Sequence, residues 1–169
     1  MDWGTELARS HDASFGWALR CCAGNRAEAD EVLQTAYLKV LDGRARFSGR
    51  SAPRTFLFGV IRRTALERYR RGQLARLLPG RLTPPEPDRN QHEVAVQHET
   101  TASLLRALGA LGRRQQEVLH LVFYEDLTVE AAAGVMGVSV GTARTHYARG
   151  KKRLRELLAA ETAGDGETR

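Results

Sequence analysis

The chain has 169 residues, enough for one large or two small domains, and its 42% apolar content favours a packed core over disorder. It carries 26 Lys and Arg against 20 Asp and Glu, and this net charge of +6 favours a polyanionic partner. No apolar run approaches the roughly 20 residues that span a bilayer, and the first residues lack the pattern of a secretory signal. We therefore expect a cytoplasmic protein without membrane insertion, in which Cys21 and Cys22 are reduced structural thiols.

The first part of the chain shows helical periodicity, and no stretch alternates apolar and polar residues long enough to predict a strand. Asn25 followed by Glu28 is typical of a capping box, and Pro53 suits the first turn of a helix. Three helices are therefore expected, over residues 6–23, 25–41 and 53–71.

The composition changes after residue 73, where closely spaced prolines predict a linker over residues 74–99. Four further helices are expected over residues 101–110, 113–124, 128–136 and 139–160, and then a flexible tail over 161–169. The predicted fold class is all-α. Two small helical domains, an N-terminal helical bundle (1–73) and a C-terminal helix-turn-helix unit (100–160), are joined by the Pro-rich linker.

The positive charge is gathered in two blocks. Residues 44–81 hold eleven basic side chains and one acid, Glu67, and residues 144–155 hold six basic side chains and no acid. Two such blocks in an otherwise acidic chain favour two separate contacts with nucleic acid. The alternative is a pair of solvated helix faces.

The strongest local motif is a helix-turn-helix between residues 127 and 150. Gly137 suits a left-handed turn between two helices, and Thr128 and Ser139 suit their N-termini. Hydroxyls and arginine near the start of the last helix suit base edges in a major groove, and the later basic residues suit phosphates. The alternative is a three-helix bundle with a basic surface.

The helix over 25–41 has two faces. One is an ordinary core stripe made of Val32, Leu33, Ala36, Tyr37, Val40 and Leu41. The other carries Glu31, Gln34, Thr35 and Leu38, and an apolar Leu38 among polar groups indicates a second packing surface for a partner. The alternative is an exposed leucine of no consequence.

The helix over 53–71 is expected to face inward with Leu57, Val60, Ile61, Thr64 and Ala65, and outward with Thr55, Gly59, Arg62, Arg63 and Arg70. A mid-helix glycine costs about 1 kcal/mol relative to alanine, so Gly59 indicates close approach by something bulky. Phe56 and Phe58, interleaved with arginines, fit the unstacked bases of a single strand. The alternative, favoured for Phe56, is that both rings lie in the core.

Four of these segments together resemble the extracytoplasmic-function (ECF) sigma factors. The run ADEVLQTAYL (29–38) resembles their region 2.2, and RTFLFGVIRR (54–63) resembles their region 2.3–2.4 helix. The runs LGRRQQEVL (111–119) and VGTARTH (140–146) resemble region 4. The resemblance covers about residues 6–160, with the motifs in the family's order.

The resemblance implies an all-α transcription initiation factor, not an enzyme, with no cofactor or metal. It implies that core RNA polymerase, promoter DNA and an anti-sigma factor are its partners. Polymerase binding would fall to Glu31, Gln34, Thr35 and Leu38. The −10 element would be bound by Arg46, Phe47, Arg50, Arg54, Thr55, Phe58, Arg62 and Arg63. The −35 element would be bound by Gly141, Thr142, Arg144, Thr145, His146, Arg149, Lys152 and Arg153.

The chain departs from the family's usual residues at five positions. An acid is usual where Thr35 stands, which implies weaker or regulated polymerase affinity, and phosphorylation would restore the charge. Phe56 for Trp and Arg63 for Asn imply an unusual −10 preference, and His146 for Arg implies a shifted −35 preference. The fifth departure is Gly112, where proline is common.

Two other function classes fit the sequence less well. A stand-alone helix-turn-helix regulator would explain the C-terminal unit but not the first basic block or Leu38, and it would need a dimer on a palindromic site. An enzyme acting on nucleic acid is not favoured, because the sequence has no phosphate-binding loop, HExxH motif or clustered metal carboxylates.

Overall fold

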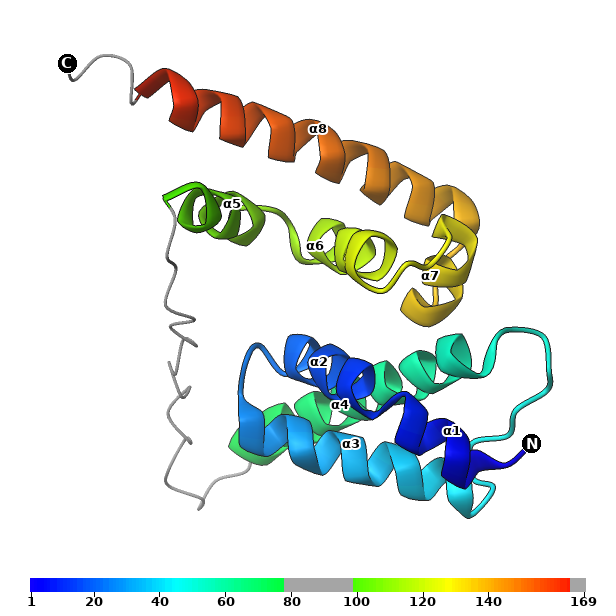
Figure 1. Ribbon diagram of the computed structural model, residues 1–169. Helices are drawn as coiled ribbons and strands as arrows, with labels where there is room; N and C mark the ends of the chain where they lie inside the picture. The colour runs from blue at the N-terminus through cyan, green and yellow to red at the C-terminus, as the bar shows by residue number, and fades with distance from the viewer. Residues whose placement is uncertain (78–98, 165–169) are drawn as a thin grey trace. The chain divides into compact units, whose positions relative to one another are not determined.

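The computed structural model describes residues 1–77 and 99–164, where every regular element is a helix (Figure 1). These residues form two compact units, which we call unit 1 (1–77) and unit 2 (99–164). The all-α fold with two helical domains is thereby confirmed. Among the described residues, no helix combines the length and the apolar character that crossing a bilayer requires.

Unit 1 contains α1 (Trp3–Arg9), α2 (His11–Cys21), α3 (Arg26–Leu41) and α4 (Pro53–Leu77). The prediction of one helix over 6–23 is wrong, because the chain bends at Ser10, whose buried hydroxyl bonds to the Glu6 carboxylate at 3.1 Å. The start of α3 is as predicted, since the Asn25 side chain accepts from the Glu28 N–H at 3.0 Å. Leu77 ends α4 six residues later than predicted, and residues 78–98 of the predicted linker lie outside the described residues.

The core of unit 1 forms where α4 packs against both α2 and α3. Trp17 of α2 and Phe58 of α4 are fully buried, their rings stack at 5.9 Å, and Trp17 Nε1 donates to the Phe58 carbonyl at 3.0 Å. The five residues of α4 that were predicted to face inward are all buried, namely Leu57, Val60, Ile61, Thr64 and Ala65.

On α3, the predicted core stripe is confirmed at four of its six positions, Val32, Leu33, Ala36 and Val40. Tyr37 is half-buried and its hydroxyl lies 3.3 Å from His11 Nδ1. Leu41 is the last residue of the helix and is 58% exposed, so its assignment to the core is wrong.

Unit 2 contains α5 (Glu99–Gly109), α6 (Arg113–Leu119), the π-helical turn η1 (His120–Tyr124), α7 (Val129–Met136) and α8 (Val140–Gly164). These bounds match the predicted helices closely, except that α8 runs four residues further than predicted, into the segment expected to be a tail. The remaining tail residues lie outside the described ranges. The Gly112 N–H donates to Gln115 Oε1 at 3.1 Å before α6, a bond that a proline at 112 could not make.

The long helix α8 packs against α5, α6 and α7, so it contacts all three of the other α-helices in the described part of unit 2. At the buried Gly150, α8 lies close against α6. A Cβ placed there would lie 3.2 Å from both Gln115 Cβ and Leu119 Cδ1. The absence of a side chain at Gly150 therefore lets the two helices meet.

We predict that Gly150→Ala lowers the free energy of unfolding of unit 2 by about 1–3 kcal/mol, because the added methyl overpacks the α6–α8 contact. Both tryptophans, Trp3 and Trp17, lie in unit 1. Denaturation followed by circular dichroism should therefore shift, whereas the tryptophan fluorescence transition should not. Gly134→Ala is the matched control, because a Cβ added at Gly134 would meet nothing within 4 Å beyond its own helix and chain neighbours. Equal stability of the two variants would contradict the prediction.

Candidate nucleic-acid interface

The described part of unit 1 leaves most of the second face of α3 uncovered. Glu31 and Gln34 are exposed, Thr35 is half-buried, and Leu38 is 57% exposed. Leu41 lies one turn further on and extends the apolar surface. The Glu31 carboxylate forms an ion pair with Arg68 of α4, so this end of the face is anchored to the neighbouring helix.

The basic loop between α3 and α4 is folded back on the end of α3. Arg44 Nε donates to Asp42 Oδ2 at 2.7 Å, and this hydrogen bond holds the pKa of the Asp42 carboxyl below its ordinary value. The Ala45 N–H donates to the Lys39 carbonyl at 2.6 Å. Gly43 has a φ of +74°, a left-handed conformation that turns the chain out of the helix.

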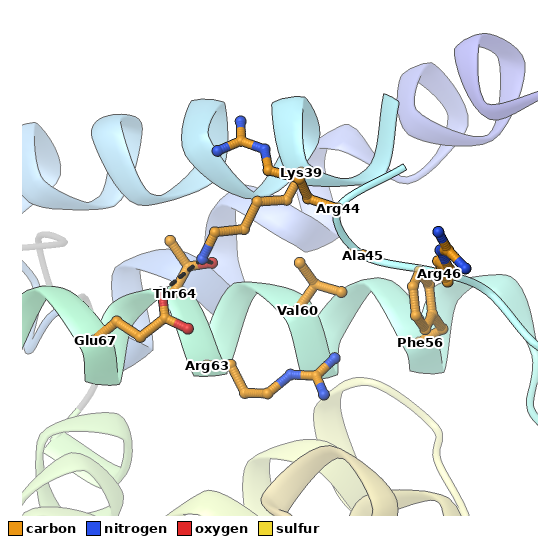
Figure 2. Close-up of a pocket in the computed structure, with 9 residues that line it drawn as sticks. All are labelled: Lys39, Arg44, Ala45, Arg46, Phe56, Val60, Arg63, Thr64 and Glu67. Atoms are coloured by element: carbon orange, nitrogen blue, oxygen red, sulfur yellow. Dashed lines mark hydrogen bonds and ion pairs between the residues drawn. The ribbon is translucent and has the colours of Figure 1, made fainter. Parts of the chain in front are cut away.

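A hollow of about 360 Å³ lies between the end of α3, this loop and α4 (Figure 2). Lys39 Nζ donates to Thr64 Oγ1 at 3.1 Å and to Glu67 Oε2 at 2.6 Å, which lowers the pKa of the Glu67 carboxyl. Arg46 and the Phe56 ring come together at the other end of the hollow. The residues that line it are Lys39, Arg44, Ala45, Arg46, Phe56, Val60, Arg63, Thr64 and Glu67.

The walls of this hollow combine four cations and one carboxylate with the apolar surface of Phe56 and Val60. Such a combination suits a flat aromatic ring with a phosphate beside it. Sequence reasoning found Arg46 and Arg63 but missed Lys39 and Glu67, because the two lie on different helices and no local pattern pairs them.

Three aromatic rings meet beside the hollow, and we call them the aromatic cluster: Trp3, Phe47 and Phe56. The Trp3 ring lies 5.5 Å from Phe47 and 5.6 Å from Phe56, and Phe47 lies 5.2 Å from Phe56. All three side chains are half-buried. Part of the surface of Phe47, a predicted DNA contact, is therefore covered by the other two rings. Sequence reasoning missed Trp3, whose ring contacts are with residues distant in the sequence.

Three predicted −10 contacts are not available at the surface. Phe58 is fully buried against Trp17, and Thr55 and Arg62 are also buried. The prediction assumed that α4 buries a single face, but packing against both α2 and α3 widens its buried arc. Arg54 is half-buried, with its guanidinium 5.2 Å above the Phe58 ring.

The remaining predicted residues of this region, Arg46, Arg50 and Arg63, are exposed. Arg46 and Arg63 both line the hollow, so the structure brings them together from the loop and from α4. Arg50 does not line it and lies at the far end of the loop, just before α4. Unit 1 therefore offers a basic surface around the hollow.

The predicted helix-turn-helix of unit 2 is confirmed. Thr128 Oγ1 accepts from the Ala131 N–H at 3.1 Å at the start of α7, and Ser139 Oγ accepts from the Thr142 N–H at 3.1 Å at the start of α8. Between them, Gly137 has a φ of +66° and gives the left-handed turn. Ala133 is buried where α7 meets the rest of the unit.

The predicted DNA-binding residues of α8 lie on its open side, where only His146 is half-buried. Two of their hydroxyls are used within the helix: Thr145 Oγ1 donates to the Gly141 carbonyl at 3.0 Å, and the Thr142 and Ser139 hydroxyls lie 2.8 Å apart. Arg144 pairs with Glu130 of α7 at 2.8 Å. The exposed members are Gly141, Thr142, Arg144, Thr145, Arg149, Lys152 and Arg153.

The two cysteines are free thiols at the end of α2. Burial raises the pKa of the Cys22 thiol to about 11, so it stays protonated and unreactive near neutral pH. Across residues 1–77 and 99–164, no three His, Cys, Asp or Glu side chains are grouped so that they could hold a metal ion.

Comparison with known proteins gives matches to both units. Residues 7–74 match the family described as sigma-70 region 2, and residues 101–154 match sigma-70 region 4. The chain is 30% identical over 150 residues to the ECF RNA polymerase sigma factor SigX of Bacillus subtilis, covering 83% of this chain and 77% of SigX. It is 27% identical over 159 residues to the ECF sigma factor SigM of Mycobacterium tuberculosis, covering 94% of this chain and 79% of SigM.

Two solved structures have the same fold. The sigma factor RpoE of Bartonella quintana, in complex with the anti-sigma factor NepR, aligns with a TM-score of 0.64 at 22% identity, covering 94% of this chain and 97% of RpoE. CnrH, in complex with the cytosolic domain of CnrY, aligns with a TM-score of 0.61 at 23% identity, covering 94% of this chain and 88% of CnrH.

Gly59 is half-buried in α4, and apart from its own helix and chain neighbours no described atom lies within 4 Å of its Cβ position. We predict that Gly59→Ala raises the free energy of unfolding of unit 1 by about 0.5–1 kcal/mol, since alanine is the better helix former. Denaturation followed by tryptophan fluorescence measures this. A loss of stability would show that the free chain itself requires glycine at position 59. A gain would mean that the free chain does not require it, which leaves contact with a bound partner as the reason for the glycine.

Proposed function

Because the chain belongs to the ECF family of RNA polymerase sigma factors, we propose that its two units divide promoter recognition between them. The protein binds core RNA polymerase and directs promoter-specific transcription initiation. Residues 1–73 hold the polymerase and bind the −10 element, and residues 100–160 bind the −35 element. The observation that supports this division is a separate basic surface on each unit, each made by residues of that unit alone.

The second face of α3 is the polymerase-binding surface in this proposal. It offers the exposed apolar side chains of Leu38 and Leu41, with Gln34 and Glu31 beside them. An exposed apolar centre with a polar rim suits a protein partner better than DNA. Thr35 is half-buried on the same face and adds no charge, so Glu31, which is paired with Arg68, is the acidic member of this face.

The basic surface of unit 1 is the −10 surface. The hollow provides the aromatic face of Phe56 and a rim of cations, including Arg46 and Arg63, for an unstacked base and its phosphate. Arg50 and Arg54 extend the positive charge along the loop and the start of α4. Phe58, Thr55 and Arg62 support this surface from within the core and do not contact DNA.

The open side of α8 is the −35 surface. Thr142, Thr145 and His146 lie near the start of the recognition helix, where side chains reach base edges in a major groove. Arg149, Lys152 and Arg153 follow on later turns and suit the phosphate backbone. Arg144 is paired with Glu130 and would exchange this ion pair for a phosphate or base on binding.

An anti-sigma factor is part of the proposal. Two solved structures with the same fold are complexes with a second protein, namely the sigma factor RpoE with the anti-sigma factor NepR, and CnrH with the cytosolic domain of CnrY. The uncovered apolar surface around Leu38 gives such a partner a site that it can occupy in place of the polymerase. The protein acts in the cytoplasm in this proposal, where it directs the chemistry of the polymerase and performs none itself.

The test is co-purification of the full chain with core RNA polymerase, followed by run-off transcription on a library of genomic fragments. The proposal expects a one-to-one complex that initiates at fragments sharing a motif in two parts. Binding to a palindromic duplex without polymerase would overturn it and point to a stand-alone regulator. Absence of both activities in the purified full chain would also overturn it.

We predict that Leu38→Asp abolishes detectable association with core polymerase, because it places a charge in the apolar centre of the binding surface. Helix content should not change, since Leu38 is 57% exposed. Leu74→Asp is the matched control, a leucine of unit 1 that is 64% exposed on α4. The measurement is the dissociation constant for core polymerase, and equal affinity of the two variants would remove Leu38 from the surface.

We predict that Arg149→Ala weakens binding to a −35 duplex by about 1–3 kcal/mol, because the guanidinium contacts a base or a well-held phosphate. Fluorescence anisotropy with the duplex identified by the transcription experiment measures the loss. Arg155→Ala removes the same charge from an exposed position further along α8 and should have little effect. If both variants lose the same affinity, Arg149 contributes only net charge.

A further inference from the structure

The aromatic cluster joins the first helix of the chain to the −10 surface. Trp3 belongs to α1, Phe47 to the basic loop and Phe56 to the first turn of α4. The Trp3 ring meets Phe47 edge-on, with an interplanar angle of 85°, and lies tilted at 42° to Phe56. Contacts of this geometry are favourable beyond the area that they bury. Trp3 thus contacts both the loop and the start of α4, whose rings Phe47 and Phe56 also contact each other at 5.2 Å.

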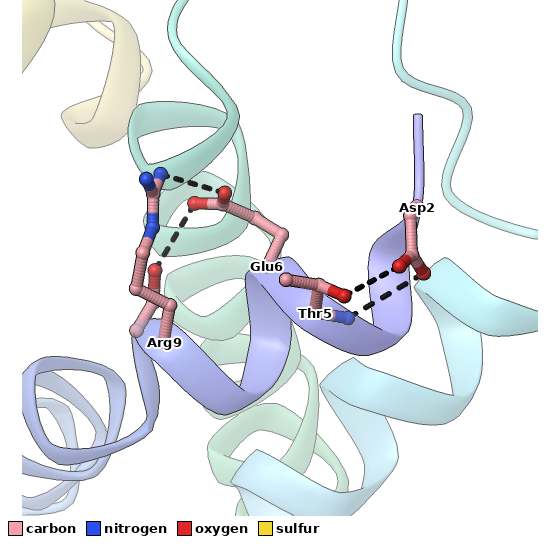
Figure 3. Close-up of polar contacts among 5 residues, drawn as sticks. Asp2, Thr5, Glu6 and Arg9 are labelled. Atoms are coloured by element: carbon pink, nitrogen blue, oxygen red, sulfur yellow. Dashed lines mark hydrogen bonds and ion pairs between the residues drawn. The ribbon is translucent and has the colours of Figure 1, made fainter.

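The helix that carries Trp3 is firmly built although it is short. At its N-terminus the Asp2 carboxylate accepts from the Gly4 N–H at 3.0 Å. It also accepts from the Thr5 N–H at 3.4 Å (Figure 3). At its other end Glu6 accepts from Arg9 at 2.7 Å, and Leu7 is buried. The position of Trp3 is therefore set by unit 1 and not by a loose terminus.

The cluster also borders the hollow. Phe56 contacts both other rings of the cluster and lines the hollow with its side chain. Phe47 directly follows Arg46, which lines the hollow at the same end (Figure 2). A shift of Trp3 would therefore move two walls of the hollow, the Phe56 ring and the Arg46 segment of the loop. Trp3 is also the sole aromatic residue of α1, so no other ring of that helix could take its place.

We propose that Trp3 is a positioning residue for −10 recognition. It acts through Phe47 and Phe56, whose packing fixes the shape of the hollow in which an unstacked promoter base is held. The loop keeps a defined conformation before DNA arrives, so binding does not have to order it. This inference rests on the proposed −10 role of unit 1, and it gives α1 an indirect role in recognition of the −10 element.

The test uses the full chain in complex with core polymerase, on a promoter fragment obtained from the run-off experiment. Permanganate reactivity of thymines in the −10 element reports strand opening. We expect Trp3→Ala to reduce the opening rate about tenfold, the equivalent of losing two aromatic pairs. Affinity for core polymerase and for the −35 duplex should stay unchanged, because neither surface includes the cluster.

Two further variants separate positioning from stability. Trp3→Phe keeps a ring in the cluster and should restore most of the opening rate. Leu7→Ala removes a buried side chain from α1 but leaves all three rings, so it should lower stability without changing discrimination among single-base variants of the −10 element. Trp3→Ala should reduce that discrimination.

The outcomes distinguish this inference from the proposed function. If the unmodified chain fails to initiate on any fragment, the sigma role of unit 1 itself is overturned. If the unmodified chain initiates and Trp3→Ala opens the promoter at the same rate with the same base preference, only the positioning role is overturned. The same result follows if Leu7→Ala reproduces the full effect of Trp3→Ala.

Discussion

The packing of α4 against two helices at once is the constraint on which unit 1 depends. The stacked pair Trp17 and Phe58, tied by a hydrogen bond to the Phe58 carbonyl, fixes the rotation of α4 about its own axis. With that rotation set, Thr55 and Arg62 turn inward, and Phe56 and Arg63 are left for the hollow. The rotation of α4 thus determines that Phe56 lines the hollow and that Phe58 packs in the core.

Four cations line the hollow, and in the free protein their mutual repulsion is offset by nearby carboxylates. Glu67 pairs with Lys39, and Asp42 pairs with Arg44 at the edge of the loop. Both pairs are partly exposed, so each adds little stability and can reorganise when a phosphate arrives. In the proposed function, these pairs hold the cations near one another before DNA binds, which favours rapid, salt-sensitive association.

Local signals in the sequence predicted the structure well, and contacts between distant residues could not be predicted. Asn25, Gly137 and Ser139 act on backbone groups within a few residues, so the pattern alone contains their function. Trp3 and Phe58 contact residues that are distant in the sequence. The spacing of apolar residues in α4 does not show which of its sides packs against a second helix. The bend at Ser10 was missed for a related reason, because a single serine within a continuous helical pattern does not usually end a helix.

The two units have separate cores, and in the proposed function this separation lets two modest surfaces recognise a promoter together. Each basic surface alone is a small, largely electrostatic contact whose affinity falls with salt. On one chain, and held by a common polymerase, the second contact becomes intramolecular once the first has formed, so the two affinities combine without a larger interface. Specificity arises because both parts of the site must be present at once, and not because either unit binds tightly.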